Sequence, residues 1–147
     1  MKSNQLDYLK YWRVIRQFIK IKYGITQSDL DMLLFLYSEK YFDRGKFEEF
    51  DNLLGWDKQR FEKLRQNEWI VVFRKRMGAR KAIYQLSIKS TRMIQSIYRK
   101  LSGEEIPVSG SHNKMFAKNV SYSDKVYRNM ILEMNKLIKQ QRHQTHE

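Results

Sequence analysis

The stretch "VVFRKRMGARKAIYQLS", from Val71 to Ser87, decides how this chain is interpreted. Two runs rich in β-branched and aromatic residues, a pattern typical of strands, lie on either side of a short segment that contains Gly78. That segment carries five cations, namely Arg74, Lys75, Arg76, Arg80 and Lys81. The sequence therefore predicts a β-hairpin with a positively charged tip. Like charges held so close together repel one another unless a polyanion neutralises them.

The residues before the hairpin predict two short helices around a tight turn. In "GKFEEFDNLLGWDKQRFEKLRQNEWI", Gly45 to Ile70, Gly55 is expected to make the turn and Asp57 to cap the second helix. The side chains expected to point inward are Phe47, Phe50 and Leu53 or Leu54 from the first helix, and Phe61 and Leu64 from the second.

Helical periodicity continues on both sides of this region. A first helix is expected over Asp7–Tyr23, stopped by Gly24, with an apolar face of Leu9, Trp12, Ile15, Phe18, Ile19 and Ile21. A second helix is expected within Ile25–Phe42, opened by Thr26 and Asp29 at capping-box spacing. Two more are expected over Lys89–Leu101 and Ser123–Gln141, joined by a polar linker at 102–119.

Helix, turn, helix and charged hairpin is the order of a winged helix-turn-helix. We expect a mostly α fold with a small β-hairpin, forming a single domain over 1–147. The winged helix-turn-helix core is expected at 25–88, with dimerisation helices at 1–24 and 89–147. The aromatic residues Trp12, Trp56, Trp69, Phe47, Phe50 and Phe61 are expected to be core residues rather than a base-stacking platform.

Charge is distributed unevenly along the chain, whose formal net charge is +13. Residues 24–56 carry three basic and seven acidic residues, whereas residues 57–81 carry nine basic and three acidic residues. An acidic block followed at once by a strongly basic one suggests a face that binds a polyanion.

Other classes of protein find little support in the sequence. The absence of cysteine excludes disulfides and thiolate metal sites. There is no apolar run long enough for a membrane span and no secretory signal, so an intracellular, cytoplasmic protein associated with the nucleoid is expected. No catalytic motif or cofactor fingerprint is present, and neither an enzyme nor a cofactor is expected. His143, His146 and Glu147 have a spacing that could touch one metal, but they lie at a chain end where fraying is expected, so no metal site is predicted.

The DNA-binding residues follow from this arrangement. With Phe61 and Leu64 buried, the residues of the second helix left to face a major groove are Lys58, Gln59, Arg60 and Lys63. Gln59 suits adenine, and Arg60 or Lys58 suits guanine. Phosphate contacts are expected for Lys63 and for the hairpin cations Arg74, Lys75, Arg76, Arg80 and Lys81. The alternatives are an ordinary exposed helix face and a solvated charged turn.

The sequence also resembles the MarR-type winged-helix regulators. The resemblance is carried by "ITQSDLDMLLFLY", by the helix-turn-helix and by "IYQLSIKSTRMIQSIYRKLSGEE". In the last of these, Leu86, Ser87 and Ser90 take the places of that family's leucine-threonine-x-x-glycine segment. The resemblance implies a homodimer whose first and last helices interlock. Such a dimer binds a pseudo-palindromic duplex with recognition helices roughly 34 Å apart. Unlike the family's usual wing, "RKRMGARKA" has no acidic residue to brace its arginines.

Two hypotheses about function remain. The first is a sequence-specific regulator of transcription that binds double-stranded DNA. The second is a winged-helix module that binds a protein partner in a transcription or nucleoprotein assembly. The first helix has two possible roles. Its basic face suits a membrane surface and is formed by Lys10, Arg13, Arg16, Lys20 and Lys22. The apolar stripe opposite that face suits a dimer seam, and this is the role that we favour.

Overall fold

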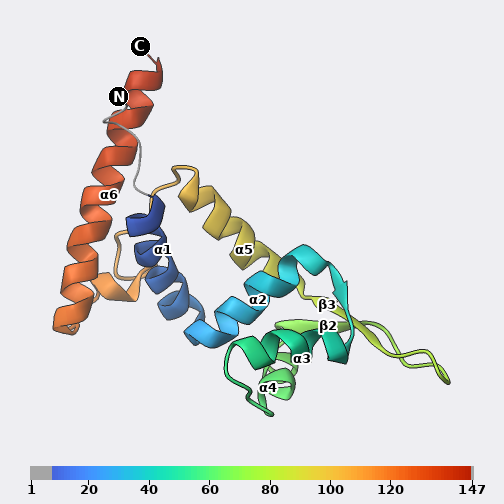
Figure 1. Ribbon diagram of the computed structural model, residues 1–147. Helices are drawn as coiled ribbons and strands as arrows, with labels where there is room; N and C mark the ends of the chain where they lie inside the picture. The colour runs from blue at the N-terminus through green and yellow to red at the C-terminus, as the bar shows by residue number, and fades with distance from the viewer. Residues whose placement is uncertain (1–7, 147) are drawn as a thin grey trace. The chain divides into compact units, whose positions relative to one another are not determined.

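The computed structural model describes the backbone of residues 8–146 and the side chains of residues 8–143 (Figure 1). The chain divides into two compact units. We call Ile25–Gln95 the winged unit, and Met1–Gly24 together with Ser96–Glu147 the helical unit. The predicted core at 25–88 lies within the winged unit, while the division into one domain with flanking dimerisation helices stays a prediction.

The winged unit combines helices with a small antiparallel sheet. In chain order its elements are α2 (Gln27–Glu39), β1 (Tyr41–Phe42), α3 (Arg44–Leu53), α4 (Arg60–Gln66), β2 (Ile70–Arg74), β3 (Ile83–Leu86) and the first part of α5 (Ile88–Leu101). The strand order is β1-β3-β2. A mostly helical unit with a small antiparallel sheet is consistent with the winged helix that the sequence predicts.

Strand β1 is absent from the sequence prediction, which included Tyr41 and Phe42 in a helical segment. The helix ends earlier because Lys40 has a φ of 65°, which a continuing helix does not allow. Tyr41 then pairs with Gln85, and Phe42 pairs with Tyr84. Two residues are too few to show the alternation by which a strand is recognised.

The core of the winged unit is built around stacked aromatic rings. Phe61 meets Phe47 and Tyr84 edge to face, each at a centroid distance of 5.0 Å. Phe47, Phe61 and Trp69 are buried, which confirms them as core residues, and Phe50 is half-buried against Phe35.

Trp56 is not a core residue, contrary to the sequence prediction, because 66% of it is exposed. Gly55, with a φ of 87°, turns the chain away from α3, and α4 begins only at Arg60. Trp56 therefore lies in a loop outside the buried faces of both helices.

The predicted hairpin is present. Strands β2 and β3 pair antiparallel, and a bridge between Met77 and Arg80 continues the ladder toward the tip. Gly78 begins the two-residue turn with a φ of 58°, a conformation that such tight hairpin turns require and glycine adopts without steric cost. The hairpin extends beyond the helices of the winged unit (Figure 1).

The helical unit contains α1 (Tyr8–Tyr23), the end of α5, a short 3-10 helix η1 (Lys114–Phe116) and α6 (Tyr122–His146). The buried face of α1 is rotated relative to the prediction, since Tyr11 and Val14 are buried while Leu9 is 87% exposed and Trp12 is half-buried. Among the described residues, no helix is both long and apolar enough to cross a membrane.

The segment predicted as a polar linker is packed into the helical unit. Ile106 and Met115 are buried, and α6 holds the backbone at both places. The Asn135 side chain donates to the Ile106 carbonyl oxygen at 2.9 Å and accepts from the Ile106 amide at 3.0 Å. The Arg128 guanidinium donates to the carbonyl oxygens of Met115 and Ala117.

Candidate nucleic-acid interface

The second helix of the helix-turn-helix begins later than its sequence suggests. Asp57 does not cap α4 directly; its carboxylate accepts from the Gln59 amide at 2.9 Å, and its carbonyl oxygen accepts from the Arg60 amide at 3.1 Å. This turn places Lys58 and Gln59 ahead of α4, and both are exposed. They are therefore accessible to a ligand, as predicted, but from a turn rather than from a helix face.

Arg60 does not face outward, and this part of the sequence prediction is wrong. Only 5% of the residue is exposed. Its guanidinium donates through Nε to the Asp29 carboxylate at 3.0 Å and through Nη1 to the Asp51 carboxylate. A side chain held in this way between two buried carboxylates does not reach a base edge, so Arg60 is not part of the interface.

This buried ion cluster joins α2, α3 and α4. Asp51 also accepts from the Asp57 amide at 3.0 Å, so the same carboxylate fixes the turn that precedes α4. Burial opposes the charged form of Arg60, but hydrogen bonds to Asp51 and Asp29 outweigh it, and the pKa of the guanidinium lies above its ordinary value. The cluster thus sets the position and rotation of α4 relative to the other two helices.

Lys63 lies at the edge of the same cluster. Its Nζ is 2.6 Å from an Asp29 carboxylate oxygen, while 44% of its side chain is exposed. Lys63 therefore already neutralises a buried carboxylate, and a phosphate would have to share it with Asp29.

The structure adds outward-facing residues that the sequence prediction missed. Glu62 and Gln66 are exposed, and they follow Gln59 at intervals of three and four residues, the spacing of one helix face. Arg44, from the start of α3, stacks over the Phe61 ring at 4.1 Å and lies 3.7 Å from the Glu62 carboxylate. The spacing from Gln59 is the one signal in the sequence that indicates Glu62 and Gln66.

The charged tip has no acidic partner within the described residues. Arg74 is half-buried and donates to the Lys81 carbonyl oxygen at 3.5 Å, and Arg76 donates to the Gly78 carbonyl oxygen at 3.3 Å. Lys75, Arg80 and Lys81 are exposed. No described carboxylate forms an ion pair with any of the five tip cations, so their repulsion is not relieved within the described part of the chain.

The base of the hairpin is held by the segment on which the family resemblance rests. The Ser90 hydroxyl donates to the Trp69 carbonyl oxygen at 2.7 Å, and the Ser87 hydroxyl accepts from the Ser90 amide at the start of α5. The Lys89 Nζ lies 3.8 Å from the centre of the Trp69 ring and donates to the Asn67 carbonyl oxygen at the end of α4. These contacts join α4, β2 and α5 within the winged unit.

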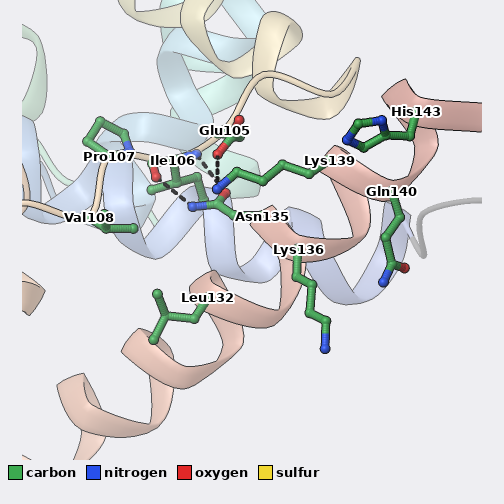
Figure 2. A pocket seen from close by; sticks show the side chains of 10 residues that line it. All are labelled: Glu105, Ile106, Pro107, Val108, Leu132, Asn135, Lys136, Lys139, Gln140 and His143. Carbon is green, nitrogen blue, oxygen red and sulfur yellow. Dashed lines mark hydrogen bonds and ion pairs between the residues drawn. The ribbon is translucent and has the colours of Figure 1, made fainter. Parts of the chain in front are cut away.

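The helical unit has a hollow of its own, of about 510 Å³, between α6 and the packed segment before it (Figure 2). Its apolar part is formed by Ile106, Pro107, Val108 and Leu132, and its rim by polar and charged side chains that include Lys136, Lys139 and His143. The other two residues of the spacing considered for a metal, His146 and Glu147, lie outside the side chains that the structure describes.

Comparisons with known proteins add little to this geometry. No protein-family model and no curated protein matches the chain. One solved structure, titled "Structure of Disulfide formed AbfR", is 16% identical, with 95% of this chain and 88% of that chain covered and a TM-score of 0.45. Similarity at this level does not establish a shared fold.

Proposed function

We propose that this protein is a MarR-like regulator of transcription that binds double-stranded DNA in a sequence-specific manner. The observation that carries the proposal is the hairpin tip, where five cations without an acidic partner among the described residues belong to the same unit as a helix-turn-helix. Cations held close together at a cost in repulsion become favourable when they displace the counterions of a phosphate backbone. The protein acts by binding rather than by catalysis and needs no cofactor.

The two parts of the interface have different roles. The wing cations Arg74, Lys75, Arg76, Arg80 and Lys81 contact the backbone and the minor groove, where a narrow groove favours arginine. Lys58 and Gln59 reach base edges in the major groove, together with Glu62 and Gln66, since carboxylates accept from cytosine and glutamine pairs with adenine. Lys63 contacts phosphate only when its ion pair with Asp29 is broken or shared.

The proposed regulator is a homodimer on a pseudo-palindromic site. Within the helical unit, exposed apolar side chains favour a seam that includes α6. Val126 and Leu132 on α6 and Val108 in the segment before it are all well exposed, and Leu132 and Val108 line the same hollow (Figure 2). Such a regulator works at the nucleoid, in the cytoplasm.

Fluorescence anisotropy on selected and random duplexes across a salt series tests the proposal. We expect a selected site to be bound at least about a thousandfold more tightly than random DNA, with affinity that falls steeply as salt rises. Steep salt dependence without selection would instead indicate a nucleoprotein component.

A second candidate function, docking to a protein in a transcription assembly, is favoured by exposed apolar side chains on the sheet and at the start of α5. Tyr41 and Phe73 are about half exposed with ring centroids 4.4 Å apart, and Ile88 is largely exposed beside a hollow of about 790 Å³. Exposed apolar patches of this kind mark interaction sites. Absence of duplex binding near physiological salt would replace the regulator with this candidate.

A further inference from the structure

Most of the net positive charge lies outside the winged unit. The sequence of the helical unit holds fifteen basic and six acidic residues, whereas that of the winged unit holds fourteen and ten. Helix α1 is the extreme case, because its 16 residues, YLKYWRVIRQFIKIKY, contain five cations and no acidic residue. A helix that served only to bury an apolar face would not need this imbalance.

Three of these cations share one side of α1. Arg13, Arg16 and Lys20 follow one another at intervals of three and four residues and therefore lie on one face. That face is opposite the buried residues of the helix, which include Tyr11, Val14, Ile15 and Phe18. Arg13 is exposed, and Arg16 and Lys20 are half-exposed.

Among the described residues, the contacts of these three side chains leave their charge uncompensated. Arg13 donates to the Tyr127 hydroxyl at 3.3 Å, and Arg16 lies over the Trp12 ring at 5.7 Å, so both partners are neutral. No described carboxylate forms an ion pair with Arg13, Arg16 or Lys20. Lys10, by contrast, lies 3.9 Å from the Glu133 carboxylate, so its charge is partly compensated.

Charge decides between the partners that this face could meet. A second copy that paired through its own α1 would place cations against cations, because the helix has no acidic residue. A phosphate backbone neutralises all three at once and gains by the release of counterions. We propose that Arg13, Arg16 and Lys20 form a second DNA-binding surface, which holds duplex phosphates without regard to sequence.

This surface goes beyond the proposed function, whose DNA contacts all lie in the winged unit. Its phosphate contacts add to those of the wing, so the salt dependence of binding is steeper than the wing cations alone would produce. It contributes equally to selected and random DNA, because phosphate contacts carry no sequence information.

The test is anisotropy of the full chain on a random 40-base-pair duplex across a salt series. Arg13→Gln/Arg16→Gln/Lys20→Gln is compared with Lys114→Gln/Lys118→Gln/Lys125→Gln, which removes the same charge from other positions of the same unit. We expect the first variant to lower the slope of log affinity against log salt by about 0.9 for each phosphate that it no longer neutralises. The matched control is expected to keep the slope.

A variant that keeps the contact of Arg16 with Trp12 controls for the possibility that the triple variant is destabilised. Arg13→Gln/Lys20→Gln is expected to produce about two-thirds of the slope change, with thermal unfolding as in the wild type. Equal slopes for the α1 variants and the matched control would overturn the inference. So would unchanged duplex binding together with weakened binding to phosphatidylserine vesicles, which would assign the face to a membrane.

Wing variants separate this inference from the proposed function. If Arg76→Ala/Arg80→Ala binds DNA as the wild type does while the α1 triple variant loses affinity, the regulator proposal fails and the second surface stands. If only the wing variant loses affinity, the second surface is wrong and the regulator proposal stands.

Discussion

At the scale of single residues, the buried position of Arg60 gives the sharpest expectation. Arg60→Ala leaves Asp29 and Asp51 buried without their shared cation, and loss of one partner of a buried ion pair costs about 3–5 kcal/mol. We expect a loss of that size in the free energy of unfolding, measured with urea. Lys58→Ala, on an exposed side chain of the same turn, is expected to change it by less than about 0.5 kcal/mol. Similar values for the two variants would contradict the ion cluster.

Lys63 is expected to contribute to both stability and DNA binding, whereas Lys58 is expected to contribute to binding alone. Lys63→Gln removes a charged partner of the buried Asp29, so we expect it to cost about 1–3 kcal/mol of stability and to weaken DNA binding. Lys58→Gln is expected to weaken binding alone. A Lys63 variant with wild-type stability would show that its interaction with Asp29 contributes nothing.

The role of Arg60 could not be predicted from the sequence for a physical reason. Its partners lie 31 and 9 residues away, and whether a cation is buried depends on both carboxylates meeting it in three dimensions. The local sequence pattern gave only the position of Arg60 relative to Phe61. The predicted start of that helix was itself wrong. A shift of one residue rotates a helix face by about 100°, which is enough to exchange an outward side chain for a buried one.

At the scale of elements, the wing is expected to act on all sequences alike. Arg76→Ala/Arg80→Ala removes two exposed cations and should lower the salt slope by about 0.9 per phosphate left without its cation, on selected and random duplexes equally. Gln59→Ala and Gln66→Ala should instead relax preference at single base positions, by about 1–3 kcal/mol each. A wing variant with the wild-type slope would remove the wing from the interface.

The end of α5 carries a stability contribution that depends on pH. Hydrogen bonding from Lys100 and the charge of Arg99 and Lys100 outweigh burial and hold the pKa of Glu104 below its ordinary value of 4.5. A lowered pKa means that this contribution is complete above pH 4.5 and is lost as the pH falls through the folded-state value. We expect Glu104→Gln to lose up to about 1 kcal/mol of stability at about pH 7 and almost none at about pH 2, in urea unfolding. An equal loss at both values would exclude the ion pair as its cause.

Elements with a long local pattern were predictable, and those fixed by distant contacts were not. The alternation in the hairpin and the periodicity of α1 and α6 showed their existence, although Leu9 was assigned to the wrong face. Strand β1 needs β3 to exist, and the burial of Ile106 needs Asn135, which lies 29 residues further along. Neither dependence can be seen in the segment itself.

At the scale of the whole molecule, the charge constrains how two copies meet. A net charge of +13 on each chain opposes association, so a dimer must bury apolar surface where cations are sparse or paired. The surface around Val108 and Leu132 suits association better than the outer face of α1. Glu105 lines the same hollow as these two residues and forms ion pairs with Lys139 and Arg142, so these two cations near this surface are paired. This difference is why we propose a seam on α6 and a polyanion partner for α1.

Leu132→Arg tests the seam in the intact protein. We expect the wild type to be a dimer at micromolar concentration, with a larger dimer fraction at higher salt because salt screens the repulsion between copies. Leu132→Arg, which puts a cation into the apolar part of the seam, should be monomeric by light scattering coupled to size exclusion. Leu53→Arg adds the same charge at an exposed leucine of the winged unit and should remain dimeric. If both variants stay dimeric, the copies associate through a surface other than α6, and the spacing of the half-sites must be derived from that surface instead.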